Sequence, residues 1–232
     1  MMVDIFSSFD PFINTLFQNY PSLFWLTAMT ALLPLQTSFW LSPSKFMFLA
    51  ASPQEIMNSQ AERTFGAHLK MFSTIVSALF LMLLITNLIG LIPYSFSMSS
   101  QLIMTLILGL PLWLSLVISG FSHAPMSATA SLLPGGAPDW LNPFLVIVET
   151  LSIVVRPITL SFRLAANMTA GHIILGLIGI YTSAAVFSGG LSFFLLLSVQ
   201  TIYVLFEVGI CLIQAYIFCL LATLYADEHP AH

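Results

Sequence analysis

A long apolar stretch, from Glu149 to Ile180, carries charged residues that could move protons through a membrane. Glu149, Arg156 and Arg163 are seven residues apart, so a helix with about 3.6 residues per turn places them on one slowly drifting face. A charge in the middle of a bilayer costs at least about 3 kcal/mol and persists only beside a partner or a water-filled cavity. Arg156 could reach a lipid headgroup, but Arg163 has long apolar flanks, and we interpret it as a functional charge.

Two further polar residues extend this pattern toward the other end of the stretch. Asn167 follows Arg163 by four residues and shares its face of the helix. His172 follows Arg163 by nine residues, a rotation of about 900°, and points to nearly the opposite side. Glu149 lies about 21 Å from Arg163 along the axis, at about 1.5 Å per residue. A central cation, with an acid toward one surface and a histidine toward the other, predicts a proton path that is interrupted at its centre.

A second apolar stretch, at about 191–225, carries its own polar stripe. Gln200, Glu207 and Gln214 are seven residues apart and fall on one helix face. If the two stretches return against each other, Glu207 can meet His172, and Gln214 comes level with Arg163. An imidazole beside a carboxylate can hold and pass a proton near neutral pH. The same two residues could be suspected of binding a metal, but a proton relay needs them equally, so we expect no metal site.

The composition places the chain in a membrane. It has 232 residues, of which 58% are hydrophobic and 6% charged, with a mean hydropathy of +0.99. A soluble domain normally has about 25% charged residues. The net charge of −4 is too small and too dispersed to indicate a nucleic-acid partner. The sequence also lacks a nucleotide-binding motif, so we expect no direct nucleotide binding, no cofactor and no catalytic centre within this chain.

The elements that must position these residues are all helices in one membrane domain, 1–232. We predict about five membrane-spanning helices and one amphipathic surface helix. Asn87, alone within a span, is expected to hydrogen-bond a neighbouring helix. In chain order the predicted segments are a leader at 1–20, a first span at 23–41, a surface helix at 53–70, a two-span hairpin at 72–120 and a long tilted hairpin at 143–225.

Charge bias predicts the orientation of these helices. Lys45, Arg63 and Lys70 are three of the five basic residues and lie in one loop, which the positive-inside rule assigns to the negative side of the membrane. The N-terminus then lies on the positive side and the C-terminus on the negative side. On this topology Glu149 is near the negative side, whereas His172 and Glu207 are near the positive side. The N-terminus has no basic region of the kind that begins a secretory signal peptide.

The segment RLAANMTAGHIILGLIG resembles subunit a of the F-type ATP synthase. Three more segments fit that family: TNLIGLIPYSF, VETLSIVVRPITLSFRLAAN and FEVGICLIQAYIFCLLATLY. The resemblance covers most of the chain from about Pro53 onward. It implies two long tilted helices that curve around a ring of c subunits, together with contacts to peripheral-stalk subunits, other Fo subunits and lipid. It also implies two offset proton half-channels that protonate and deprotonate the ring carboxylates and so drive rotation and ATP synthesis.

The resemblance implies a role for each polar residue. Arg163, which precedes LAAN, matches the essential arginine between the half-channels. Asn167 and Gln214 match the polar residues beside that arginine, and they join Glu207 and His172 in the uptake half-channel. Glu149 matches the acid of the release half-channel.

The exchange of acid and histidine between positions 172 and 207 is typical of mitochondrial members of this family. The implied location is therefore the mitochondrial inner membrane, with the N-terminus on the intermembrane-space side and the C-terminus in the matrix. Two alternatives remain open on the residues alone. The chain could be a stand-alone proton-coupled secondary transporter, although such folds usually show internal repeats, and we find none. Glu149 could also simply pair with Arg156 near a headgroup.

Overall fold

The computed structural model describes residue 9 and residues 45–64, 71–92, 97–130, 132 and 140–227. The predicted first span, 23–41, lies outside these residues, as does the predicted leader except for Phe9. Within the described part every regular element is a helix, and there is no strand. The helices are α2 (Lys45–Ala61), α3 (Phe72–Gly90), the 3-10 helix η4 (Met98–Ser100), α4 (Leu102–His123), α5 (Pro125–Ala130), α6 (Asn142–Ser188) and α7 (Gly190–Asp227).

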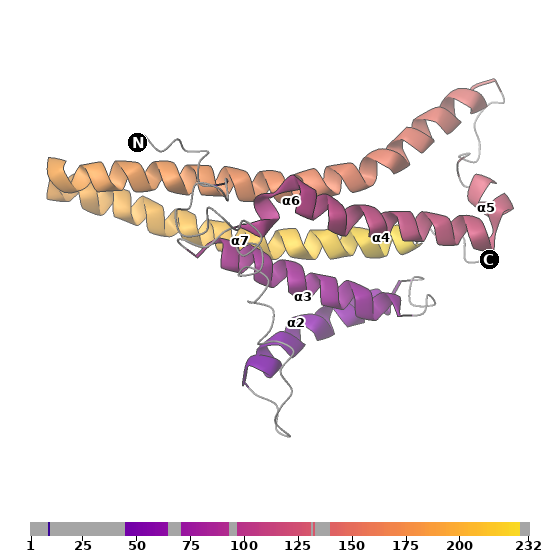
Figure 1. Cartoon of the computed structure of the whole chain (residues 1–232), viewed down its shortest axis with the longest axis horizontal. Coiled ribbons are helices and arrows are strands. Elements are labelled where there is room, and N and C mark those ends of the chain that lie inside the picture. The colour runs from indigo at the N-terminus through magenta and orange to yellow at the C-terminus, as the bar shows by residue number, and fades with distance from the viewer. Residues whose placement is uncertain are drawn as a thin grey trace, which may run out of the picture.

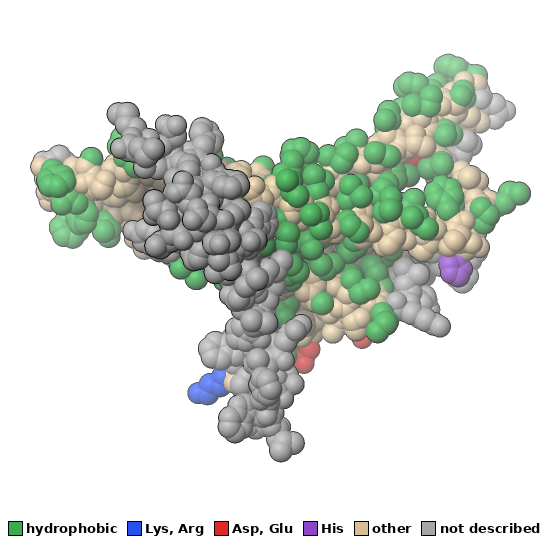
Figure 2. Space-filling model, viewed as in Figure 1, with side chains coloured by type: hydrophobic (Ala, Val, Ile, Leu, Met, Phe, Trp, Pro, Cys, Tyr) green, Lys and Arg blue, Asp and Glu red, His purple; other side chains and the backbone are tan. Residues whose placement is uncertain are grey.

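Four of the described helices, α3, α4, α6 and α7, are long and apolar enough to cross a membrane. Their mean hydropathies lie between 1.8 and 2.3, and about 20 residues suffice for a hydrocarbon core of about 30 Å. The prediction of a helical integral membrane protein is confirmed. Figure 2 shows hydrophobic side chains covering this face of the helices, while most of the charged side chains in view lie over α2.

The helices α6 and α7 form the longest hairpin of the described fold. They have 47 and 38 residues, well beyond the length of one upright span, as the sequence predicted. Only Gly189 separates them, and its φ of 156° is a backbone conformation that residues with a Cβ rarely adopt. The two helices run side by side from this turn (Figure 1). The tight turn therefore sets which residues of α6 face which residues of α7.

The helix α6 is not straight. Its initial part rises away from the other helices, whereas the rest of it lies along its neighbours (Figure 1). Pro157 lies within α6 and supplies no backbone donor to the helical hydrogen bonds, which is a common cause of a bend. Arg163 follows Pro157, on the part of α6 where Leu160 and Leu164 are buried, whereas Glu149 precedes it.

A buried core joins α2, α3, α6 and α7. Leu164 of α6 and Ala215 of α7 are completely buried, and α4 packs on α6 beside them. Small residues allow this close approach, as in other membrane helix bundles. The members of the core cluster are Met57, Phe72, Val76, Phe80, Leu83, Leu160, Leu164, Ala215, Phe218, Cys219 and Ala226.

The surface helix differs from its predicted bounds of 53–70. The helix α2 begins at Lys45, continues through Pro53 and ends at Ala61, and residues 65–70 are not described. The mixed polar spacing that indicated a surface helix starts only near Pro53, because the preceding turn and a half is apolar. Met57 and Ala61 are buried, and α2 packs against α3. This contact holds α2 against the membrane helices.

The contact between α4 and α6 gives the first prediction. A Cβ at Gly109 would lie 2.9 Å from the Ser161 Oγ. Ser161 is completely buried, and its hydroxyl donates to the Pro157 carbonyl oxygen at 2.9 Å. Gly109→Ala should therefore destabilise the chain by about 1–3 kcal/mol, the usual cost of overpacking a filled core. The measurement is the thermal unfolding midpoint of the purified chain in detergent.

Two companion variants make this test specific. Gly109→Ala combined with Ser161→Ala removes the clashing oxygen and should restore most of the lost stability. Gly209→Ala serves as the control, since a Cβ there has no heavy atom of the described structure within 4 Å beyond the glycine's own helical surroundings. Equal midpoints for Gly109→Ala and Gly209→Ala would contradict the close packing of α4 on α6.

Candidate functional site

The polar residues of α6 lie around the face that this helix buries. Leu160, Leu164 and Met168 are buried on that face. At about 100° per residue, Arg163 and His172 flank it on opposite sides. The helix thus separates the arginine from the histidine across its own width, as the spacing predicted.

Arg163 is exposed on the surface of the helical bundle. It lies near the middle of α6, among apolar residues. Among the described residues no carboxylate lies within ion-pairing distance of its guanidinium. An uncompensated charge within a bilayer is costly, so an exposed arginine on an apolar helix is stable only beside a partner or water that lies outside the described part of the chain.

One turn beyond Arg163, a hydrogen bond connects α6 to α7. The Asn167 Nδ2 donates to the Gln214 Oε1 over 2.9 Å. Gln214 is buried, and Asn167 is half-buried. The hairpin therefore brings together these two polar residues, which the sequence analysis grouped with Arg163, and the bond pairs a donor of one amide with the acceptor of the other.

Glu207 lies in the interface between α6 and α7 and is only 2% exposed. The Tyr203 hydroxyl, one turn earlier on α7, donates to its Oε1 over 2.6 Å. On the other side the carboxylate lies flat against Gly171 of α6, where a Cβ would be 2.5 Å from both carboxylate oxygens. The acid is thus held between a phenol and a glycine, neither of which the sequence analysis identified.

The signals for these two missed residues were weak. The four-residue spacing between Tyr203 and Glu207 places them on one face, but many pairs in a helix have that spacing. Gly171 precedes His172, and its role depends on a side chain of another helix. Neither contact follows from one helix considered alone.

His172 is half-buried, and its Nε2 has no hydrogen-bond partner among the described residues. The Phe9 ring meets the imidazole edge-on, at 6.1 Å between ring centroids. The Glu207 carboxylate lies against Gly171, which is the residue that precedes His172. The described hydrogen bonds do not connect the two side chains. A proton could pass between them only through a further group such as a water molecule.

Glu149 and Arg156 form an ion pair in the first part of α6, with 3.7 Å between the Glu149 Oε1 and the Arg156 guanidinium. The carboxylate is 40% exposed and the guanidinium side chain 25%. The guanidinium also lies 5.4 Å from the centre of the Tyr225 ring on α7. The pairing that the sequence left open as an alternative is therefore present. At about 1.5 Å per residue, Arg156 and Glu149 lie about 10 and about 21 Å from Arg163 along the helix.

Asn87 does not make the interhelical side-chain bond expected of it. The residue is completely buried, and neither atom of its amide has a hydrogen-bond partner among the described residues. Its backbone carbonyl oxygen instead accepts a weak contact of 3.9 Å from the Cys211 Sγ. The Asn87 backbone therefore lies close to Cys211 of α7, one turn along from Glu207.

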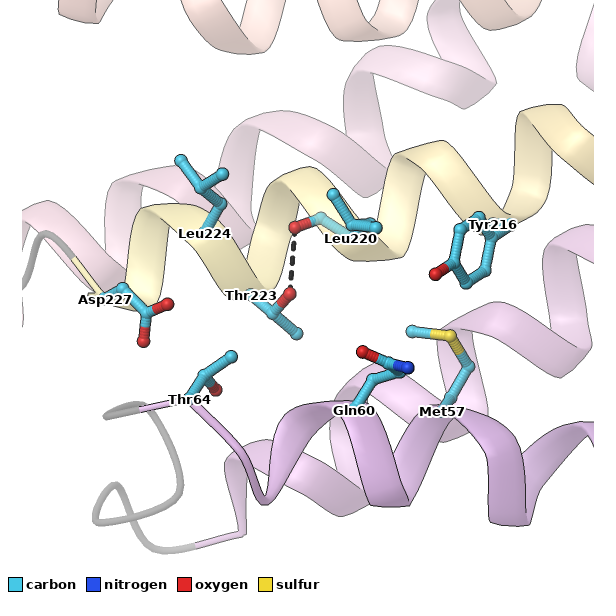
Figure 3. Close-up of a pocket in the computed structure, with 8 residues that line it drawn as sticks. All are labelled: Met57, Gln60, Thr64, Tyr216, Leu220, Thr223, Leu224 and Asp227. Atoms are coloured by element: carbon cyan, nitrogen blue, oxygen red, sulfur yellow. Dashed lines mark hydrogen bonds between the residues drawn. The ribbon is translucent and has the colours of Figure 1, made fainter.

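A cavity of about 180 Å³ lies between α2 and α7 (Figure 3). Gln60 from α2 and Tyr216, Thr223 and Asp227 from α7 are among its lining residues. At about 100° per residue, Tyr216 lies on the opposite face of α7 from Glu207. The cavity is therefore separate from the polar residues between α6 and α7. Within the described part of the chain, no cluster of three or more His, Cys, Asp or Glu residues could hold a metal ion.

Comparison with known proteins identifies relatives along the whole chain. The family described as ATP synthase A chain matches residues 21–227. The ATP synthase subunit a of Artemia franciscana is 40% identical over 236 residues, which cover 98% of this chain and 100% of the relative. The subunits a of Branchiostoma floridae and Drosophila melanogaster are 39% and 38% identical and cover 99% and 98% of this chain, and 100% and 99% of the relatives.

These similarities agree with the family that the sequence motifs indicated. They extend over the two long helices and over the polar residues between them. The chain belongs to the ATP synthase A chain family.

Proposed function

We propose that this chain is the proton-conducting stator subunit of a mitochondrial F-type ATP synthase. Membership of the family makes it a subunit of an ATP synthase complex. The observation that carries the finer proposal is Arg163, an exposed cation on an apolar helix without a described acidic partner. A ring of c subunits with intramembrane carboxylates would supply that partner. A stand-alone transporter would need an acid of its own near Arg163, and the described residues offer none.

Proton uptake begins on the positive side, between α6 and α7. Glu207 receives the proton, and His172 passes it toward the ring. The unpartnered Nε2 of His172 supports this order, since a buried imidazole nitrogen without a protein partner is a natural site for a bridging water. The bonded pair Asn167 and Gln214 lies beyond them, beside Arg163, and forms the polar end of this half-channel.

Rotation follows from the different membrane costs of the two states of a ring carboxylate. The protonated, neutral form can move into lipid, whereas the ionised form cannot. Arg163 stabilises the ionised form as it passes, and its fixed positive charge blocks a direct proton leak. A potential of about 150 mV supplies roughly 3.5 kcal/mol for each proton, at about 2.3 kcal/mol per 100 mV.

Proton release occurs toward Glu149 on the negative side. Glu149 is partly exposed and lies about two turns after the start of α6. Its side chain is 40% exposed, so water can connect the carboxylate both to the ring and to the negative side of the membrane. The separation from Glu207 forces the ring to carry each proton between the two half-channels.

The assembly and orientation follow from this assignment. The chain lies in the mitochondrial inner membrane with its N-terminus toward the intermembrane space and its C-terminus in the matrix. Its partners are the c-subunit ring, peripheral-stalk and other Fo subunits, and membrane lipids. Nucleotide chemistry belongs to other subunits of the complex.

Substitution of Arg163 tests the central charge. Arg163→Ala should abolish coupled ATP synthesis and permit passive proton flow, because the barrier between the half-channels is a charge. Arg163→Lys should also fail, since an ammonium is a compact charge that can lose its proton when desolvated. Both rates are measured in liposomes that contain the assembled complex. Normal ATP synthesis in either variant would refute the assignment.

Glu149 and Arg156 give a matched pair of substitutions. Glu149→Gln should slow proton-driven synthesis by at least about tenfold, since a positioned proton-transfer group contributes about 10²-fold or more. Arg156→Gln should slow it by less than about fivefold, because a partly exposed ion pair contributes about 1 kcal/mol or less. Equal losses in the two variants would mean that Glu149 serves only as the partner of Arg156.

A further inference from the structure

In the described structure, the Tyr203 hydroxyl donates a hydrogen bond to the buried Glu207 carboxylate. The distance of 2.6 Å is typical of an O–H group that donates to a charged carboxylate, and such bonds are stronger than those between neutral groups. Glu207 is almost completely buried, so it has lost most contact with solvent. An acid in this environment depends on its protein donor for its position.

Along one face of α7, Tyr203 lies where the side chains change from half-buried to buried. Gln200 and Tyr203 are half-buried, whereas Glu207, Cys211 and Gln214 farther along the same face are buried. Tyr203 lies one turn, or about 6 Å, nearer to the start of α7 than Glu207. Its neighbours on either side, Ile202 and Val204, are exposed. The phenol is therefore the last partly accessible group before the buried acid.

Gly171 restricts the carboxylate from the opposite side. A Cβ at this position would overlap both oxygens, so the acid occupies the space that the glycine leaves. The Tyr203 hydroxyl fixes one oxygen, and the backbone at Gly171 limits the position of the whole group. Together they hold Glu207 beside the residue that precedes His172.

We propose that Tyr203 is a positioning residue for proton uptake, which holds the Glu207 carboxylate against Gly171 and within reach of His172. This inference rests on the proposed function, in which Glu207 accepts the proton. A glutamate side chain has three rotatable bonds, and without the phenol its carboxylate can turn toward the more open start of α7. Proton transfer depends steeply on the placement of donor and acceptor, so a displaced carboxylate slows uptake.

The test compares Tyr203→Phe, Glu207→Gln and the double variant in the assembled ATP synthase, reconstituted into liposomes. ATP synthesis driven by an imposed proton gradient is measured per assembled complex. Tyr203→Phe keeps the aromatic ring and removes only the hydroxyl. We expect it to slow synthesis by about tenfold, the effect of one lost hydrogen bond to a charged group. The double variant should be no slower than Glu207→Gln alone, because Tyr203 acts through that carboxylate.

Two further variants separate positioning from a loss of structure. Tyr216→Phe removes a hydroxyl from the opposite face of the same helix and should leave the rate unchanged. Tyr203→Gln retains an N–H donor of shorter reach and should recover part of the rate that Tyr203→Phe loses. A recovered rate in Tyr203→Gln would show that the hydrogen bond matters, because glutamine does not replace the volume of the aromatic ring.

An unchanged rate in Tyr203→Phe would overturn the inference, as would a double variant whose loss equals the product of the two single losses. A second readout is the infrared carbonyl stretch of the protonated Glu207, identified as the band that Glu207→Gln removes. It should shift in Tyr203→Phe and not in Tyr216→Phe. If Glu207→Gln itself leaves synthesis unchanged, the assignment of Glu207 to proton uptake fails, and that result differs from a failure confined to Tyr203.

Discussion

The cost of placing a charge in an apolar membrane governs the arrangement of this protein. A guanidinium in the middle of a membrane-length helix costs at least about 3 kcal/mol unless another charge compensates it. Arg163 is exposed on such a helix, and the described residues provide no carboxylate for it. The other cation of α6, Arg156, has both an acid and an aromatic ring beside it. The contrast between these two arginines is the basis of our proposal that Arg163 interacts with a partner outside the described part of the chain.

The hairpin of α6 and α7 brings other polar groups into contact with one another, so that they need no additional charged residues within the membrane. The turn at Gly189 fixes the register of the two helices, so Asn167 meets Gln214, and Glu207 fits against Gly171. These contacts give Asn167, Gln214 and Glu207 a neighbour on the other helix. The His172 Nε2 has no hydrogen-bond partner among the described residues, and our proposal assigns a mobile proton to that site. Structure and proposed proton path therefore use the same contacts.

Helical spacing predicted the features that depend on a single helix. The seven-residue stripes, and the opposite orientation of Arg163 and His172, follow from about 100° of rotation per residue. The lengths of α6 and α7 followed from the apolar runs. Contacts across helices depend on register and rotamers, which no single stretch contains. The phenol of Tyr203 beside Glu207 and the bend at Pro157 were therefore missed, and the start of α2 at Lys45 was masked by the apolar residues before Pro53.

The two-half-channel account is tested most directly by the side of the membrane from which each acid is accessible. The buried Cys211 and Cys219 are first replaced by alanine, and Glu149→Cys and Glu207→Cys are then introduced separately into the assembled complex. A small membrane-impermeant thiol reagent is added to one side at a time. We predict that position 149 reacts only from the negative side and position 207 only from the positive side. Reaction of both positions from the same side would place the two acids in one cavity and contradict the account.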